Sequence, residues 1–139
     1  MAISQAMATS FKAEILDEQH DLVADTLKIA LYTSSASLGA TTTAYSATNE
    51  VANGNGYATG GVTLANKAVS TSGTTAYFDA DDPTWTSASF TARGALIYND
   101  TNGDKAIAVL NFGGDFTVSS GTFRIVFPAA GANAIITIA

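Results

Sequence analysis

Short stretches of alternating apolar and polar residues fill the second half of the chain, and turn residues separate them. Such an alternation places every second side chain on one face, which is typical of half-buried β-strands. The pattern predicts five strands: Thr84–Thr91, Arg93–Tyr98, Lys105–Phe112, Thr122–Phe127 and Ala134–Ile138. We therefore expect a compact all-β body.

Glycine and asparagine define the turns that follow each of the two most apolar segments. Asn102-Gly103 favours positive φ angles, so it predicts a hairpin that joins Arg93–Tyr98 to Lys105–Phe112. Gly113-Gly114-Asp115 predicts a bend or a β-bulge before the next strand. This central hairpin is the expected folding core.

The first half of the chain contains fewer regular segments. Thr26–Thr33 alternates cleanly and predicts the first strand. Val62–Ser70 and Thr74–Ala80 predict a hairpin around Gly73. Between them, Ser34–Gly61 consists mostly of small residues and glycine turns, and segments of this length without regular structure are often functional. It could form an Ω-loop, a short edge strand or a surface that partners order.

A helix is predicted over residues 3–17, because Ile3, Met7 and Phe11 recur at a spacing of four. Two interpretations remain open for it. The helix could pack against a sheet, or it could be an arm that docks on a neighbouring subunit. In either case residues 1–25 form an N-terminal helix or arm, and residues 26–139 form the β-body.

Length and composition indicate one domain that can bury a core. The chain has 139 residues, of which 47% are hydrophobic and only 13% are charged. Domains of about 100–200 residues are usual, and charged residues normally make up about 25%. The fold class expected is all-β, a single antiparallel β-sandwich or jelly-roll-like domain with a short N-terminal helix. Its charge-poor surface suits permanent assembly.

Charge and cysteine content exclude several function classes. The net charge is −6 and the six basic residues are scattered, so binding to nucleic acid or to anionic membranes is not expected. The chain contains no cysteine, which excludes disulfides and thiolate chemistry. We find neither a signal-peptide pattern nor an apolar run of about 20 residues, so we expect synthesis in a cytoplasm and a soluble product or assembly.

Three groups of residues could carry chemistry, and a structural role accounts for each. His20 stands alone among carboxylates, as a solvated or ion-paired loop residue, a metal ligand or a pH switch. Asp100-x-Asn102-x-Asp104 resembles part of a calcium loop, but its glycine is misplaced and no glutamate follows at the required position. Asp79, Asp81 and Asp82 could act as hydrolase carboxylates, yet acidic loops usually cap strand ends. We predict no enzyme, and no catalytic, cofactor-binding or metal-binding residues.

Trp85 is the only tryptophan of the chain. It could anchor the core, where a large ring buries the most apolar area, or form an exposed platform for sugar stacking. A core anchor is the more common role for such a residue, so we expect the core position.

Several segments resemble a group of small virion structural proteins of tailed bacteriophages: Phe11–Leu16, Leu27–Thr33, Phe90–Asn99 and Val109–Gly114. The likeness covers nearly the whole chain, but it consists of strand and turn signatures and carries over no functional residue. The resemblance implies a virion protein. From size and composition we expect a capsid decoration (cement) protein that contacts the major capsid protein or other virion proteins as a homo-oligomer, dimer or trimer. A tail or fibre component that binds host-surface glycans is the other possibility.

Overall fold

The computed structural model describes residues 2–139. Most of the regular structure in this range is β-strand. Strands account for 47% of the chain and helix for 6%, which confirms the expected all-β, sandwich-like class with one short helix. The elements are β1 (Ala6–Met7), α1 (Thr9–Leu16), β2 (Leu27–Tyr32), β3 (Val62–Thr63), β4 (Ala68–Ser72), β5 (Thr75–Asp79), β6 (Thr84–Asn99), β7 (Lys105–Arg124) and β8 (Ile136–Ile138).

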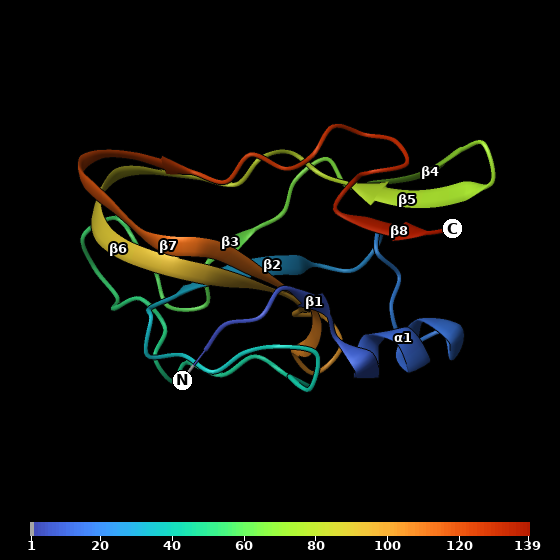
Figure 1. Ribbon diagram of the computed structural model, residues 1–139, viewed down its shortest axis with the longest axis horizontal. Helices are drawn as coiled ribbons and strands as arrows, with labels where there is room; N and C mark the ends of the chain where they lie inside the picture. Colours follow the sequence, from blue (N-terminus) through green and yellow to red (C-terminus); the bar gives the residue numbers. More distant parts are fainter. Residues whose placement is uncertain (1) are drawn as a thin grey trace.

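Two antiparallel sheets make up the body. The larger has the order β1-β7-β6-β2-β3, and the smaller has the order β4-β5-β8. Figure 1 shows the small sheet above one end of the large sheet, with α1 on the opposite side of the large sheet. At the other end the long β6–β7 ribbon bends back over itself.

The β6–β7 hairpin is longer and more continuous than the sequence pattern predicts. The predicted break between Thr91 and Arg93 is a register shift within β6, because the pairing passes from Ala92–Phe116 directly to Gly94–Asn111. The same irregularity confirms the predicted bulge around Gly113, which has a φ of +79°. Bulges increase local twist and bend a strand pair, so this one lies where the ribbon curves.

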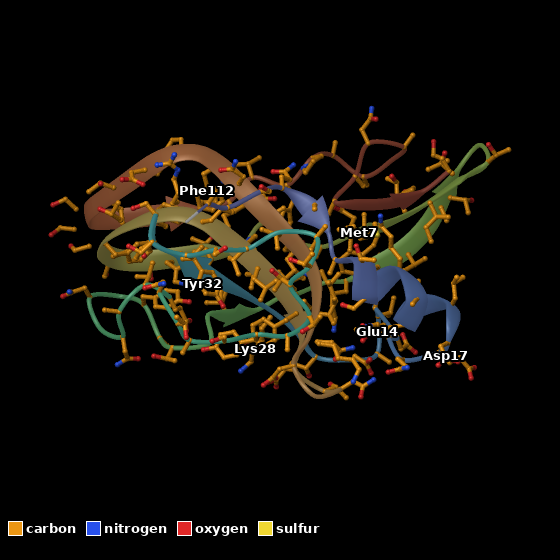
Figure 2. The ribbon with its side chains drawn as sticks, turned by 60° about the horizontal axis from the view of Figure 1, so that its bottom comes forward. Met7, Glu14, Asp17, Lys28, Tyr32 and Phe112 are labelled. Carbon is orange, nitrogen blue, oxygen red and sulfur yellow. The ribbon has the colours of Figure 1, made fainter. Side chains whose placement is uncertain are left out.

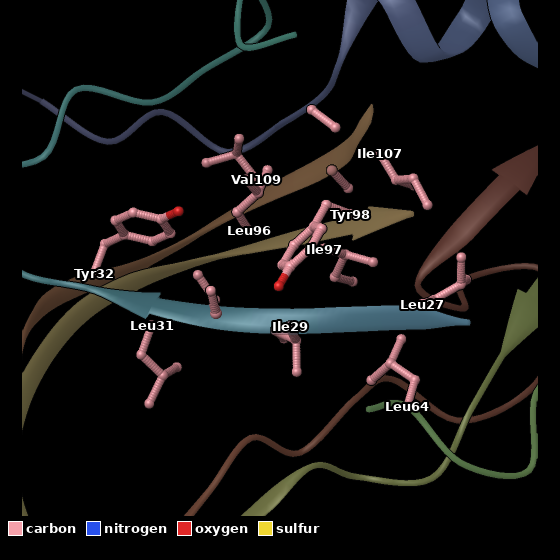
Figure 3. Close-up of a cluster of buried hydrophobic side chains, with 14 of the residues drawn as sticks. Leu27, Ile29, Leu31, Tyr32, Leu64, Leu96, Ile97, Tyr98, Ile107 and Val109 are labelled. Atoms are coloured by element: carbon pink, nitrogen blue, oxygen red, sulfur yellow. The ribbon is translucent and has the colours of Figure 1, made fainter. Parts of the chain in front are cut away.

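Strand β2 forms the centre of the core because both of its faces are covered. Figure 3 shows Ile29 and Leu31 pointing to the side of Leu64, whereas Tyr32 points to the other side. All four side chains are buried. A strand that is covered on both faces needs apolar residues on both, which explains the nearly continuous apolar run from Leu27 to Tyr32.

The helix is shorter than predicted, since residues before Thr9 are extended. Ile3 forms a bridge with Leu38, and β1 pairs with β7. A spacing of four also fits one face of a strand, whose period is two, so Ile3 and Met7 reach the core from extended backbone. The predicted hairpin after Gly61 is likewise smaller: β4 pairs with β5, but β3 pairs with β2.

The Ser34–Gly61 segment is ordered by its own chain, mainly through Glu50. The Glu50 carboxylate accepts hydrogen bonds from the Tyr45 hydroxyl at 2.6 Å, from the Tyr57 hydroxyl and from the Gly60 N–H at 2.7 Å. Val51 N–H donates to Leu31 O at 2.9 Å, which attaches the segment to β2. The long loop is therefore a fixed surface of the domain.

Candidate functional site

An open apolar groove of about 450 Å³ lies where the β6–β7 ribbon bends back on itself. We call it the β7 groove, because all of its lining comes from β7 and the two residues after it. Its lining residues are Phe112, Phe116, Thr117, Val118, Thr122, Phe123, Arg124, Ile125 and Val126. Figure 2 shows Phe112 at this end of the molecule, far from Glu14 and Asp17.

Phe123 connects the groove to the aromatic core beneath it. Its ring packs against Trp85 at 5.9 Å, against Phe90 at 5.2 Å and against Phe112 at 6.1 Å between centroids. These tilted and edge-to-face arrangements are the preferred geometries of aromatic pairs. Tyr57 continues the cluster from the long loop, 5.9 Å from Phe90. The floor of the groove is therefore held by packed rings.

Two large apolar side chains at the groove remain exposed to solvent. Phe116 is 54% exposed and Val126 is 72% exposed. Phe116 also packs edge-to-face on Phe112, with 6.2 Å between the ring centroids. Exposed apolar side chains that surround an apolar hollow are typical of a site for protein contact.

The charged residues near the groove form pairs of opposite sign. Arg93 lies 3.3 Å from Asp115, and Arg124 lies 2.8 Å from Asp82. The Arg124 guanidinium lowers the pKa of the Asp82 carboxyl, and a hydrogen bond from Phe127 N–H lowers it further. Asp79 and Asp81 line the neighbouring hollow, which shares Thr122 and Arg124 with the groove, so carboxylates outnumber arginines in this part of the surface.

The outer edge of β7 is largely free beside the groove. Within residues 2–139 its neighbour on that side is β1, which pairs only with Ala108 and Val109. Beyond the bulge, from Phe116 to Arg124, β7 pairs with β6 alone. An uncovered edge presents N–H and C=O groups to which another strand can bind.

Trp85 is 3% exposed, which confirms the predicted core position. Its ring stacks near Tyr57, with 6.4 Å between centroids. The indole N–H has no hydrogen-bond partner among the described residues. A ring so deeply buried cannot serve as an exposed stacking platform for a sugar.

Two of the three aspartates considered as hydrolase carboxylates, Asp81 and Asp82, accept hydrogen bonds near strand ends. Asp82 binds Arg124 and the Phe127 N–H, and so joins the start of β6 to the segment after β7. Asp81 accepts a hydrogen bond from the Asn66 amide. A general acid for glycoside hydrolysis requires a raised pKa, whereas that of Asp82 is lowered. The structure brings Asp79, Asp81 and Asp82 around one shallow hollow, in which Asp81 and Asp82 accept internal hydrogen bonds.

Internal contacts and backbone conformation account for the polar residues of the Asp100–Asp104 turn. The Asn102 amide donates to Gln19 O, and Asp100 lies 4.0 Å from Lys28. Asp104 has a φ of +57° and accepts the Tyr45 N–H through its backbone carbonyl. Residues 2–139 contain no group of three or more His, Asp or Glu side chains that could hold a metal ion.

His20 is buried, and it belongs to a chain of hydrogen bonds between the N-terminal region and the β6–β7 turn. Asn99 Oδ1 accepts the Thr101 and Asn102 N–H groups, so its amide nitrogen must be the donor to His20 Nδ1 at 3.0 Å. His20 Nε2 then carries the proton and donates to Glu14 at 3.0 Å. His20 is therefore not a solvated loop residue: its side chain is buried, and its hydrogen bond to Glu14 anchors α1.

Sequence reasoning did not find the groove-forming side chains. Phe116 and Val126 belong to ordinary alternating segments, and their exposure depends on how the ribbon bends. The bulge at Gly113 was the available signal, because bulges often occur where a strand pair curves.

Comparisons with known proteins gave no match: no family model matches the chain, and no curated protein or solved structure matches it. The one helix within residues 2–139, α1, is neither long nor apolar enough to span a membrane. The arrangement at the groove can bind apolar side chains and an extended strand.

Proposed function

We propose that this chain is a structural protein of a bacteriophage virion, in which it decorates the capsid and bridges neighbouring coat subunits. The proposal is supported by the resemblance of its strand segments to small phage virion proteins. A protein that binds only the assembled lattice stabilises that lattice by its binding free energy at every copy. We propose a mechanical role of this kind, without catalysis.

The observation that carries the proposal is the fixed, nearly uncharged surface of Ser34–Gly61. Glu50 is the only charged residue in this segment, and its carboxylate is occupied by internal hydrogen bonds. Small side chains lose little conformational entropy on contact, and a loop that is already ordered has little more to lose. Such a surface suits a large, permanent contact with coat subunits.

Free strand edges offer a second means of attachment. β4 and β8 are the outer strands of the small sheet. All five residues of β4 are exposed. A coat segment could add to either edge through backbone hydrogen bonds.

A tail or fibre component that binds host glycans is the second candidate function. The resemblance to virion proteins supports it equally, but the burial of Trp85 removes the aromatic platform on which a sugar would stack. The exposed ring of Phe116 lies in an apolar groove, where few polar groups could bind sugar hydroxyls.

Immunogold labelling of purified virions with antibodies against this chain tests the proposal. We expect label over the capsid shell. Label confined to the tail would overturn the capsid role and favour the second candidate, and unlabelled virions would overturn both.

The contact surface can be tested with purified capsids that lack the protein. Thr41→Lys and Ala47→Lys place charges on exposed positions of the long loop, whereas Ala13→Lys places one on the exposed face of α1. We expect the first two to weaken sedimentation with capsids at least tenfold and Ala13→Lys to bind normally. Equal binding by all three variants would contradict a role for the loop.

A further inference from the structure

We propose that the β7 groove is the contact surface of a twofold homodimer, in which each copy occupies the groove of the other. This inference goes beyond the proposed function and does not depend on it, because dimer formation can be measured on the purified chain.

The groove and the side chains that could fill it belong to the same surface. Phe116 and Val126 are more than half exposed and stand beside the hollow whose floor is Phe123. Across a twofold axis, a projecting group of one copy meets the hollow of the other, and the contact occurs twice. A surface that presents both a projection and a hollow can therefore complement itself.

Seven of the twelve acidic residues lie at the opposite end of the molecule, together with Lys12, Lys28, Lys67 and Lys105. The N-terminal connector and the β6–β7 turn meet there through the hydrogen bonds of Asn99 and Asn102. Figure 2 shows Glu14 and Asp17 at this end and Phe112 at the other. We call this end the acidic pole; its acidic residues are Glu14, Asp17, Glu18, Asp21, Asp25, Asp100 and Asp104.

This charge distribution selects the geometry of a contact between two copies. Each copy has a net charge of −6, so two copies repel each other at a distance. A head-to-tail contact would press the acidic pole against an apolar groove and desolvate its carboxylates. A groove-to-groove contact leaves the charged groups of both poles in water and joins the ends at which Asp115 and Asp82 are paired with Arg93 and Arg124.

The free edge of β7 supplies the interface area that the groove lacks. A standard interface buries about 800 Å² per partner, roughly an eighth of the 6876 Å² surface of this chain. The groove alone is too small for this. A twofold axis through the edge from Phe116 to Arg124 would pair two β7 strands antiparallel and join two large sheets.

Sedimentation velocity of the full chain over a range of concentrations tests the proposal. We expect a dimer that Phe116→Asp weakens at least a hundredfold in dissociation constant, and that Val126→Asp weakens in the same way. Two variants are used so that a folding defect in one does not decide the result; circular dichroism identifies such a defect. Added salt should tighten the dimer, because it screens the repulsion between like-charged copies.

Leu16→Asp and Val69→Asp are the matched controls. Leu16 is 88% exposed on α1 and Val69 is 55% exposed on β4, so each variant places the same charge on an exposed apolar position outside the groove. We expect both controls to dimerise like the unchanged chain. A monomer at all concentrations, or a dimer that only the control variants disrupt, would overturn the proposal.

The absence of cysteine from the sequence allows a geometric test with spin labels. A label on Thr117→Cys should give one short distance between copies, and a label on Asp17→Cys should give a long one. The reverse order would place the acidic poles together and overturn the twofold groove contact. Capsid binding is assayed separately, so a monomer that still binds capsids would contradict only this inference.

Discussion

The Tyr57 hydroxyl lies between the Glu50 carboxylate and strand β2. It donates a hydrogen bond to Glu50 and accepts one from the Leu31 N–H at 2.9 Å. Tyr57 is 3% exposed, so both bonds are shielded from water. One side chain therefore joins the long loop to the core strand and at the same time satisfies a buried backbone donor.

Replacing Tyr57 with phenylalanine should lower the free energy of unfolding by about 1–3 kcal/mol, because it leaves the Leu31 N–H without an acceptor. The ring packing on Trp85 and Phe90 is preserved. Urea denaturation measures the loss, and limited proteolysis within residues 34–61 should become faster.

Tyr45→Phe is the control for this experiment, since the Tyr45 hydroxyl binds Glu50 without accepting a backbone N–H. We expect Tyr45→Phe to lower the free energy of unfolding by less than half as much as Tyr57→Phe. Equal losses for the two variants would show that the Leu31 donor is unimportant.

Four tyrosines should make the protein unstable in alkaline solution. Desolvation raises the pKa of Tyr32, Tyr45, Tyr57 and Tyr98. Nearby carboxylates raise it further, Glu50 for the first three and Asp104, Asp100 and Glu50 for Tyr98. In the unfolded chain these groups release protons near pH 10, whereas the folded chain retains them. The unfolded state then binds fewer protons, so stability is complete below about pH 10 and falls as the pH rises above it.

Urea denaturation at a series of pH values, together with the phenolate absorbance, measures this loss. Tyr57→Phe removes one of the groups with a raised pKa, so its stability should decline less steeply above about pH 10. A stability that is constant well above that pH would contradict the burial of these hydroxyls.

Much of the fold could be predicted from the alternation of residues, because one face of most strands is covered. Leu27–Tyr32 and the hairpin around Asn102-Gly103 are where the pattern places them. The continuity of β6 could not be predicted, since a register shift at Ala92 interrupts the alternation without ending the strand. Ile3 and Met7 fit a helix and an extended segment equally, and only pairing with β7 decides between them.

The candidate site could be predicted far less well. Local alternation shows which residues share a face, but it does not show which face another element covers. Phe123 and Phe116 both lie on β7, yet Phe123 is partly covered by the bent ribbon and Phe116 is exposed. That difference results from the path of the whole hairpin.

Asn99→Asp should destabilise the protein by about 3 kcal/mol or more at neutral pH, since it places a second carboxylate beside Asp25 in a fully buried position. The Asn99 amide now donates to Asp25 and lowers the pKa of that carboxyl. A protonated aspartic acid can restore this donor, so the loss should shrink as the pH falls.

Asn102→Asp provides a comparison in the same turn, because Asn102 donates to Gln19 O and is less buried. We expect a smaller loss from it. Nitrogen chemical shifts of His20 should show the proton on Nε2 in the unchanged chain, as the donor role of Asn99 requires. A proton on Nδ1 would contradict the hydrogen-bond chain.

Gly61→Ala should abolish folding or cost more than about 4 kcal/mol, a range that marks severe steric conflict. A Cβ atom on Gly61 would lie 1.8 Å from the Ile29 carbonyl oxygen, where β3 approaches β2. Backbone cannot move away as a flexible side chain can. The positive φ of +81° adds a further cost.

Gly73→Ala separates the steric conflict from the positive φ angle as causes of the lost stability. Gly73 has a φ of +61°, but nothing lies within 4 Å of an added Cβ in the β4–β5 turn. We expect this variant to lose only the conformational cost, about 1–2 kcal/mol. Thermal unfolding compares the two directly. Similar losses would mean that φ alone requires glycine at position 61, and that β2 and β3 do not approach as closely as the register Ile29–Val62 demands.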